Sequence, residues 1–175
     1  MQPKVLMSVD EYLHTPFDGA DCDYVDGEVI ERNMGELPHA LLQGELLYRL
    51  RQVASSLNLL VIPEIRIQVS QTRLRVADVA VWRPGPIGTR IPTVPPLLVV
   101  EVLSAEDRLV RLQPKIRDYL TYGVEWLWII DPDERRALTY APSDPGGTLV
   151  TELRTTNPDI VVSLPDLLAV LDREP

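Results

Sequence analysis

The sequence predicts an α/β fold in which helices flank a central sheet. Two short apolar runs of strand length, residues 74–82 and 97–103, are rich in β-branched residues. Two longer segments, residues 38–57 and 104–122, place apolar residues at the spacing of an amphipathic helix. With 175 residues, 45% of them hydrophobic, the chain is long enough to bury a substantial core as one domain, residues 1–175.

The N-terminal segments predict a short helix and a hairpin. Ser8-Val9-Asp10-Glu11 fits a capping box that opens a helix, and Pro16 ends it. Residues 18–23 read as an acidic loop. In residues 24–30 an Asp-Gly pair supplies the positive φ angles of a type I′ turn, which predicts a tight hairpin.

The remaining segments predict further strands joined by loops. Residues 59–69 alternate polar and apolar side chains, which indicates a strand with one wetter face. Residues 83–96 are dense in proline and glycine and predict a surface loop. Pro114, inside the second helix, predicts a kink or a second helix start. Later strands are expected at residues 124–130, 137–140, 149–153 and 160–163, and a closing helix at residues 165–171.

The composition excludes several classes of protein. A formal net charge of −9 argues against coating nucleic acid by bulk charge, although a local basic cleft is compatible with it. The single cysteine, Cys22, excludes an intrachain disulfide and a cysteine-based zinc site, and its polar, acidic surroundings indicate an incidental residue. No apolar run approaches the ~20 residues that span a bilayer, and the N-terminus lacks a signal-peptide core. We expect a cytoplasmic protein without a membrane partner.

Each of the two apolar strands carries one carboxylate in its interior, Asp78 in the first and Glu101 in the second. An ionised carboxylate in an apolar strand is costly unless it is paired, hydrogen-bonded or bound to metal. Two such acids on consecutive strands therefore suggest one shared site, provided that the faces set by strand alternation coincide. Lys115, on the following helix, lies at the edge of the apolar stripe, where it can lean into a cleft.

Two acids and a lysine are the parts of a metal-dependent nuclease centre. Phosphodiester hydrolysis needs charge neutralised at a phosphate and a water activated for in-line attack, and a divalent ion does both. Carboxylates suit Mg²⁺ or Mn²⁺, which keep several waters. A nearby lysine can orient the water or stabilise the developing charge. Spacing alone leaves open the commoner interpretation of such acids as structural ion-pair members.

An ordered set of short blocks resembles the Uma2 family, also known as DUF820. The resemblance covers roughly residues 8–141 and implies a restriction-endonuclease-like fold of the PD-(D/E)XK nuclease superfamily, a mixed central sheet flanked by helices with an N-terminal helix and hairpin. The matching blocks are Tyr24–Glu28, His39, Arg75–Val81, Leu98–Ser104, Lys115 with Tyr119, Gly123-Val124 and Trp126–Pro132.

The resemblance also implies roles for particular residues. Asp78 and Glu101 would ligate Mg²⁺ or Mn²⁺, and the backbone carbonyl of Val102 would add a third ligand. The position two after Glu101, where the superfamily keeps its lysine, is Leu103 here. Lys115 would then be the catalytic cation, moved to the next helix.

Other positions have two interpretations each. Glu28 would supply a further acid to the metal, or be an exposed hairpin residue. His39 would join the site, or be only a helix cap or a surface residue. Glu64 is interpreted as a solvated charge, and Trp126 and Trp128 as core or dimer-interface residues. Arginines near the cleft in sequence could contact phosphates or be solvated: Arg66, Arg73, Arg75, Arg108 and Arg111.

The expected activity is Mg²⁺-dependent endonucleolytic hydrolysis of DNA. A homodimer is an option, because cutting both strands favours two-fold symmetry. Two alternatives stay open. The acidic net charge and Leu103 keep a catalytically degenerate nucleic-acid- or protein-binding module in view, and RNA is a possible substrate in place of DNA.

Overall fold

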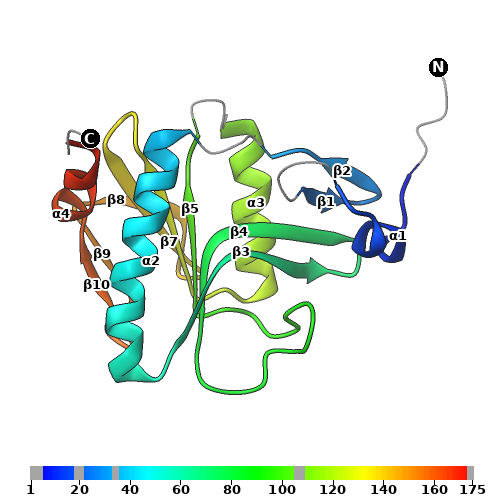
Figure 1. The fold of residues 1–175 in the computed structure, drawn as a ribbon, viewed down its shortest axis with the longest axis horizontal. Coiled ribbons are helices and arrows are strands. Elements are labelled where there is room, and N and C mark those ends of the chain that lie inside the picture. The colour runs from blue at the N-terminus through cyan, green and yellow to red at the C-terminus, as the bar shows by residue number, and fades with distance from the viewer. Residues whose placement is uncertain (1–5, 18–21, 33–35, 105–108, 173–175) are drawn as a thin grey trace.

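The computed structural model describes residues 6–17, 22–32, 36–104 and 109–172, which form four α-helices and ten strands (Figure 1). A short 3₁₀ helix, η1 (Ala169–Asp172), ends the described chain. The helices are α1 (Val9–His14), α2 (Leu37–Leu57), α3 (Leu109–Tyr122) and α4 (Leu164–Leu168). The strands are β1 (Asp23–Val25), β2 (Glu28–Ile30), β3 (Leu60–Ser70), β4 (Arg73–Trp82), β5 (Leu98–Val102), β6 (Trp126–Asp131), β7 (Arg136–Ala141), β8 (Asp144–Val150), β9 (Glu152–Arg154) and β10 (Val161–Ser163).

The main sheet is mixed, which confirms the predicted fold class. Its strand order is β2-β1-β4-β5-β6-β7-β8, with β3 also paired to β4. Strands β5 and β6 run parallel, and the other pairs in this sheet are antiparallel. A separate two-stranded sheet joins β9 and β10. Helix α2 lies on one side of the main sheet and α3 on the other (Figure 1).

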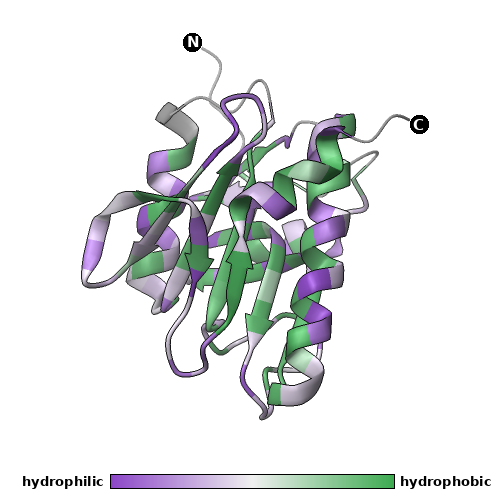
Figure 2. Ribbon diagram, turned by 90° about the vertical axis from the view of Figure 1, so that its left-hand side faces the viewer, coloured by the Kyte–Doolittle hydropathy of each residue, from purple (hydrophilic) through white to green (hydrophobic). Residues whose placement is uncertain are grey.

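The sheet separates two layers of apolar core. On one side, Leu46 of α2 shares a core with Val100 and Trp128. Trp128 is thus a core residue, one of the two locations predicted for it. On the other side, Ile116 of α3 shares a core with Leu127. The central strands are accordingly green in Figure 2, whereas α2 also carries purple, hydrophilic residues. Among the described residues, no helix is both long and apolar enough to cross a membrane.

Local sequence signals explain the start of the chain. The capping box is present, because the Ser8 hydroxyl accepts from the Glu11 amide while the Glu11 carboxylate accepts from the Ser8 amide. Asp26 and Gly27 both have positive φ, 50° and 97°, as the predicted hairpin turn requires. Helix α2 ends at Leu57, and the following residue turns into the left-handed conformation.

Several predicted boundaries are wrong. The single strand expected at residues 149–153 is two strands, β8 and β9. Strand β8 begins at Asp144 and contains Pro145, Gly146 and Gly147; it is an edge strand, where residues unsuited to a central strand are tolerated. The acidic loop is also shorter than predicted, because Asp23 already belongs to β1 and is buried; residues 18–21 lie outside the described ones.

Cys22 and Pro114 lie in segments that the structure describes in part. Cys22, which the sequence analysis interprets as incidental, is buried, at 5% exposure. Helix α3 runs through Pro114 without ending there. Its predicted first turn, residues 105–108, lies outside the described residues.

Two different strands, β1 and β5, pair with the same edge of β4 and leave a gap between them. Strand β3 pairs with β4 from end to end, so β1 and β5 must share the opposite edge. Strand β1 pairs with residues 73–74, and β5 pairs with residues 79–81. Residues 75–78 of β4 lie between these two pairings, and side chains take the place of a neighbouring strand there.

At Asp78, the side chains of β4 stop alternating regularly between the two faces of the sheet. The register on either side places Glu64 of β3 opposite Asp78. The backbone of Glu64 has a φ of 46°, in the left-handed region that residues other than glycine rarely adopt. Ala77 and Ala80 share the core beside α3, whereas Val79 belongs to the core beside α2. The plain alternation predicted for β4 is therefore interrupted at its buried acid.

Candidate active site

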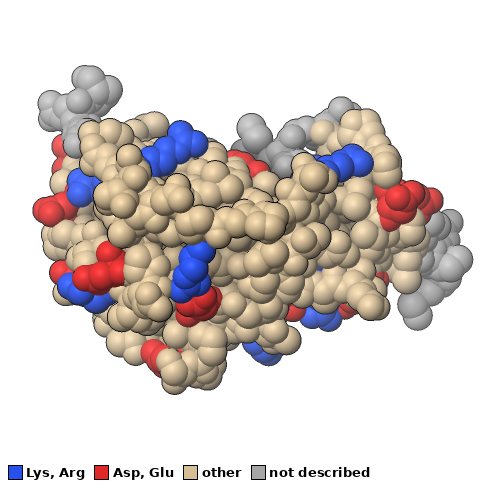
Figure 3. Space-filling model, turned by 90° about the horizontal axis from the view of Figure 1, so that it is seen from below, with Lys and Arg blue, Asp and Glu red and all other residues tan. Residues whose placement is uncertain are grey.

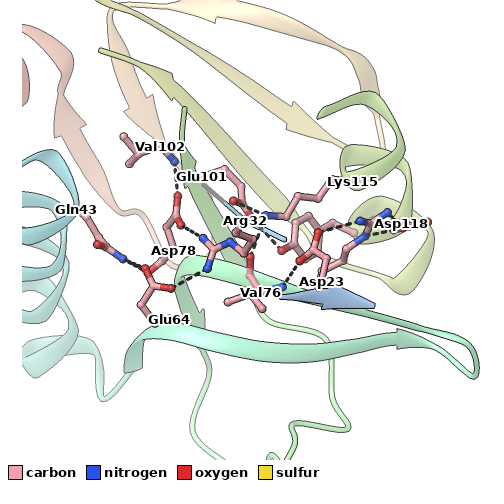
Figure 4. Close-up of polar contacts among 12 residues, drawn as sticks. Asp23, Arg32, Gln43, Glu64, Val76, Asp78, Glu101, Val102, Lys115 and Asp118 are labelled. Carbon is pink, nitrogen blue, oxygen red and sulfur yellow. Dashed lines mark hydrogen bonds and ion pairs between the residues drawn. The ribbon is translucent and has the colours of Figure 1, made fainter. Parts of the chain in front are cut away.

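Asp78 is the buried acid at the division of the sheet. Its side chain is 1% exposed, and its Oδ2 accepts a hydrogen bond of 2.7 Å from the Val102 amide. The β4–β5 pairing ends at Val79 and Val100, so this carboxylate supplies the acceptor that a strand would otherwise provide. His39 Nε2 lies 3.2 Å from the same oxygen. Arg32 pairs with Oδ1, as Figure 4 shows.

Cationic neighbours keep Asp78 ionised. Burial alone would raise the pKa of this carboxyl. The hydrogen bond with His39 and the charges of Lys115 and Arg32 outweigh burial, so the pKa of Asp78 lies below its ordinary value. The same contact raises the pKa of His39 above its ordinary value, against the opposing effect of burial.

Glu101 is the second buried acid, and α3 supplies its partners. Lys115 Nζ lies 2.7 Å from Glu101 Oε2 and also donates to the Val76 carbonyl at 2.9 Å. The Tyr119 hydroxyl donates to Glu101 Oε1 at 2.8 Å. Pro114 therefore does not prevent the lysine from reaching the strand acid.

Burial has the largest effect on the pKa of the Glu101 carboxyl. It raises the pKa of Glu101 to about 7, even though the charge of Lys115 lowers it. Burial would lower the pKa of Lys115, but the charge of Glu101 more than compensates and the pKa lies above its ordinary value. Glu101 can thus gain or lose a proton near neutral pH, whereas Lys115 keeps its charge.

Both acids open on one cavity of about 310 Å³, a volume in the range of small-molecule sites. Arg32, which follows β2, and His39 of α2 also line the cavity. Residues of β4, β5, α2 and α3 and of the segment after β2 therefore meet there. The remaining lining residues are Asp23, Val25, Ile30, Glu31, Arg75, Val102, Leu103, Ser104, Leu112, Pro114 and Lys115.

The donor chemistry fits a hard divalent cation. In the parallel ladder, the Trp126 amide donates to Leu97 and the Leu103 amide to Ile130, so odd-numbered residues of β5 bond to β6. The peptide groups of Val102 therefore face the other way, toward Asp78. Two carboxylates and this carbonyl make an all-oxygen set of the kind that Mg²⁺ uses together with waters. The described residues contain no ready-made cluster of three or more His, Cys, Asp or Glu side chains for a metal.

Glu28 is the predicted site residue that the structure does not bring to the acids. It lies on β2 opposite Val25, is partly exposed and does not line the cavity. Its role as a metal ligand stays a prediction without geometric support. The other five predicted positions, by contrast, line the cavity: Asp78, Glu101, Val102, Lys115 and His39.

Sequence reasoning missed three site residues, namely Arg32, Gln43 and Glu64. Gln43 Nε2 donates to the Asp78 carbonyl at 3.1 Å and also to Glu64. Gln43 lies four residues after His39 on α2, a spacing that places both on one helix face and could have revealed it. Arg32 follows the hairpin outside any periodic pattern, and Glu64 looked like an ordinary exposed strand position.

The three described arginines interpreted as possible phosphate contacts or solvated charges have protein partners, and only Arg75 among these three lines the cavity. Arg75 is buried between Asp23, at 2.9 Å, and Asp118, at 2.7 Å. Arg73 pairs with Asp26 and Asp118, and Arg66 lies over the Tyr12 ring, 5.3 Å from its centroid. Arg108 and the Arg111 side chain lie outside the described residues.

A mixed sheet with two helices packed across it, and acids buried at a division of the sheet, defines a nuclease-like α/β fold. The chain belongs to the Uma2 family, described as "Putative restriction endonuclease", because the family model matches residues 9–173. A crystal structure of a "putative nuclease belonging to DUF820" from Anabaena variabilis has the same fold, with a TM-score of 0.82 and 21% identity. The similarity covers 94% of this chain and 99% of that one. No curated protein matches the chain.

Proposed function

We propose that this protein is a divalent-metal-dependent endonuclease of the PD-(D/E)XK kind that hydrolyses phosphodiester bonds of DNA. The observation that carries the proposal is the pair of buried acids, Asp78 and Glu101, which open on one cavity with Lys115 held 2.7 Å from Glu101. Membership of the Uma2 family supports the same activity.

Asp78, Glu101 and the Val102 carbonyl would hold Mg²⁺ or Mn²⁺. The bound ion would neutralise phosphate charge and activate a water for in-line attack. The Val102 amide fixes the orientation of Asp78, and Tyr119 fixes that of Glu101. These contacts preorganise both acids before any ligand arrives, which is the condition for efficient electrostatic catalysis.

Lys115 is the cation of the proposed mechanism. Glu101 and the Val76 carbonyl hold its ammonium group at the cavity, and its raised pKa keeps it charged. A charge fixed there can orient the attacking water or stabilise charge that develops on the phosphate. Leu103 packs against the core beside α3 and carries no charge. In this proposal Lys115 of α3 serves in place of the strand lysine of the general superfamily.

The test combines metal titration with a cleavage assay. Isothermal titration of Mn²⁺ into the wild type should show binding that Asp78→Asn and Glu101→Gln abolish. Asn and Gln are preferable to Ala because they leave an acceptor for the Val102 amide and the Tyr119 hydroxyl. Plasmid nicking should require Mg²⁺ and fall by at least about 100-fold in both variants, as expected for loss of a metal site. Asp159→Asn, an exposed acid paired with Arg154, is the matched control.

The alternatives predict other outcomes. Metal-independent binding of nucleic acid without cleavage would indicate a binding module on a nuclease scaffold. Cleavage of single-stranded RNA but not DNA would make RNA the substrate. A homodimer and a cytoplasmic location stay predictions, and sedimentation analysis of the purified chain tests the first.

A further inference from the structure

The guanidinium group of Arg32 lies among the acids of the site. Its Nη2 pairs with Asp78 Oδ1, and its Nη1 donates to Glu64 Oε2 at 2.8 Å (Figure 4). The Arg32 side chain is only 17% exposed. An arginine thus binds the acid that the proposed function assigns to a metal ion.

The two oxygens of Asp78 have different partners. Oδ2 already accepts the Val102 amide and lies beside His39. Oδ1 is the oxygen that Arg32 binds. A metal ion that takes Asp78 as a ligand while the strand contact persists must therefore use Oδ1. It then competes directly with Arg32, and two cations cannot share that oxygen without strong repulsion.

The other cations of the cavity are already committed. Lys115 is held by Glu101 and the Val76 carbonyl. Arg75 is neutralised by Asp23 and Asp118. On Glu101 a metal ion can use Oε1, which among the described residues accepts only the neutral Tyr119 hydroxyl, and leave Lys115 on Oε2. Arg32 alone among these three would then lose a partner when the metal binds, and it would still line the cavity from its remaining contact with Glu64. A guanidinium is suited to bind two oxygens of a phosphate at once.

We propose that Arg32 and the divalent metal exclude each other on Asp78 Oδ1, and that the displaced Arg32 binds the phosphate of the substrate. This inference rests on the proposed function, because it takes Asp78 as a metal ligand. Arg32 then serves the site twice: it neutralises the buried acid in the apoprotein and recognises the phosphodiester in the metal-bound protein. The glutamate opposite Asp78 keeps the guanidinium beside the cavity in both states.

The decisive variant is Arg32→Ala, with Arg154→Ala as the matched control. Arg154 pairs with exposed acids on β9 and beyond, outside the cavity. Titration of Mn²⁺ should show binding at least about tenfold tighter in Arg32→Ala than in the wild type, because the competing charged hydrogen bond is gone. Fluorescence anisotropy in saturating Mn²⁺, with a phosphorothioate oligonucleotide, should show DNA binding at least about tenfold weaker in the same variant. Arg154→Ala should change neither quantity.

Opposite effects in one variant distinguish this role from a structural one, which would weaken both interactions. Unchanged or weaker Mn²⁺ binding in Arg32→Ala, with wild-type binding still lost in Asp78→Asn, would overturn the inference and leave the proposed function standing. No Mn²⁺ binding in any variant would remove the proposed function instead.

A measurement on the wild type covers the case in which Arg32→Ala does not fold. The arginine side-chain NMR resonances can be followed during titration with diamagnetic Mg²⁺. The Arg32 resonance should shift with the same midpoint as metal binding measured by calorimetry. A resonance that stays unchanged at saturation would show that the ion leaves the arginine in place, contrary to the proposal.

Discussion

Two tyrosines on α3 differ in whether their buried hydroxyl groups have a hydrogen-bond partner, and therefore in whether the hydroxyl stabilises or destabilises the fold. The Tyr119 hydroxyl donates to the Glu101 carboxylate, and the whole side chain is buried. The Tyr122 hydroxyl is buried without a hydrogen-bond partner in the part of the chain that the structure describes. A buried polar group without a partner costs free energy, whereas a hydrogen bond to a charged group is among the stronger ones.

The two tyrosines should therefore respond oppositely to loss of their hydroxyl groups. Tyr119→Phe should lower the free energy of unfolding by about 2 kcal/mol, because Glu101 loses a charge-assisted bond. Tyr122→Phe should leave the free energy of unfolding unchanged or raise it. Urea unfolding followed by circular dichroism in EDTA measures both. Equal losses in the two variants would contradict this account of their hydroxyl groups.

At this scale the sequence reveals the acids but not what surrounds them. A carboxylate inside an apolar strand is unusual because burying its charge is costly, and this makes Asp78 and Glu101 recognisable from the sequence. Arg32 and Glu64 gave no such signal. The first depends on how a hairpin folds over the site, and the second on a left-handed backbone that local patterns do not encode.

Among the elements, α1 allows a test of how a cap holds a helix on the sheet. Ser8→Ala should lower the free energy of unfolding by about 1 kcal/mol at neutral pH, a typical cost for losing an N-cap. Hydrogen bonds from Ser8 lower the pKa of Glu11 below its ordinary value of 4.5. Since the folded-state pKa is depressed, this stabilisation is present above pH 4.5 and disappears as the pH falls through the folded value.

The measurement is the difference in unfolding free energy between wild type and Ser8→Ala across that pH range. The difference should narrow as the solution is acidified. A constant difference from pH 7 to pH 3 would show that the hydrogen bond from the Ser8 hydroxyl to the Glu11 carboxylate contributes nothing.

Elements with a strong periodic signal were predictable, and β8 was not. Helix α2 and strands β4 and β5 carry long apolar patterns with clear ends, so their predicted bounds differ from the observed ones by a residue or so. Strand β8 contains Pro145, Gly146 and Gly147, and most of its residues are exposed. Its strand conformation comes from pairing with β7 and not from its own residues.

For the whole molecule, the charge distribution limits how the proposed substrate, DNA, can bind. The net charge is −9, and on the face in Figure 3 basic and acidic side chains are interspersed and form no broad basic area. The described cavity cations are paired with acids. Binding should thus depend on the metal and on few phosphate contacts, in contrast to proteins that track DNA with a basic surface.

This predicts a weak salt dependence. In Mn²⁺, the logarithm of the DNA association constant should fall against the logarithm of salt concentration with a slope no steeper than about −3, which corresponds to about three phosphate contacts. In EDTA, binding should be undetectable at the same protein concentrations. Anisotropy titrations of a labelled phosphorothioate oligonucleotide measure both quantities. A slope of about −6 or steeper would reveal a larger cationic footprint than the described surface shows.

The pairing of distant segments was the least predictable property of the whole chain. The mixed sheet followed from the family resemblance, and the family match and the similar crystal structure confirm it. Local patterns, however, contain no information that β1 and β5 share one edge of β4. That arrangement creates the opening in which the acids, the lysine and the arginine meet.

The hydrogen bond between Asp78 and the Val102 amide has a consequence for the evolution of this site. A lineage that had lost the proposed nuclease activity would still need an acceptor here to complete its sheet, so selection for folding alone would retain this aspartate. Glu101 and Lys115 are different, since an apolar pair of similar volume, accompanied by Tyr119→Phe, can replace this buried ion pair at little cost in stability. Among relatives, drift at those two positions would therefore mark the loss of cleavage long before the aspartate changed.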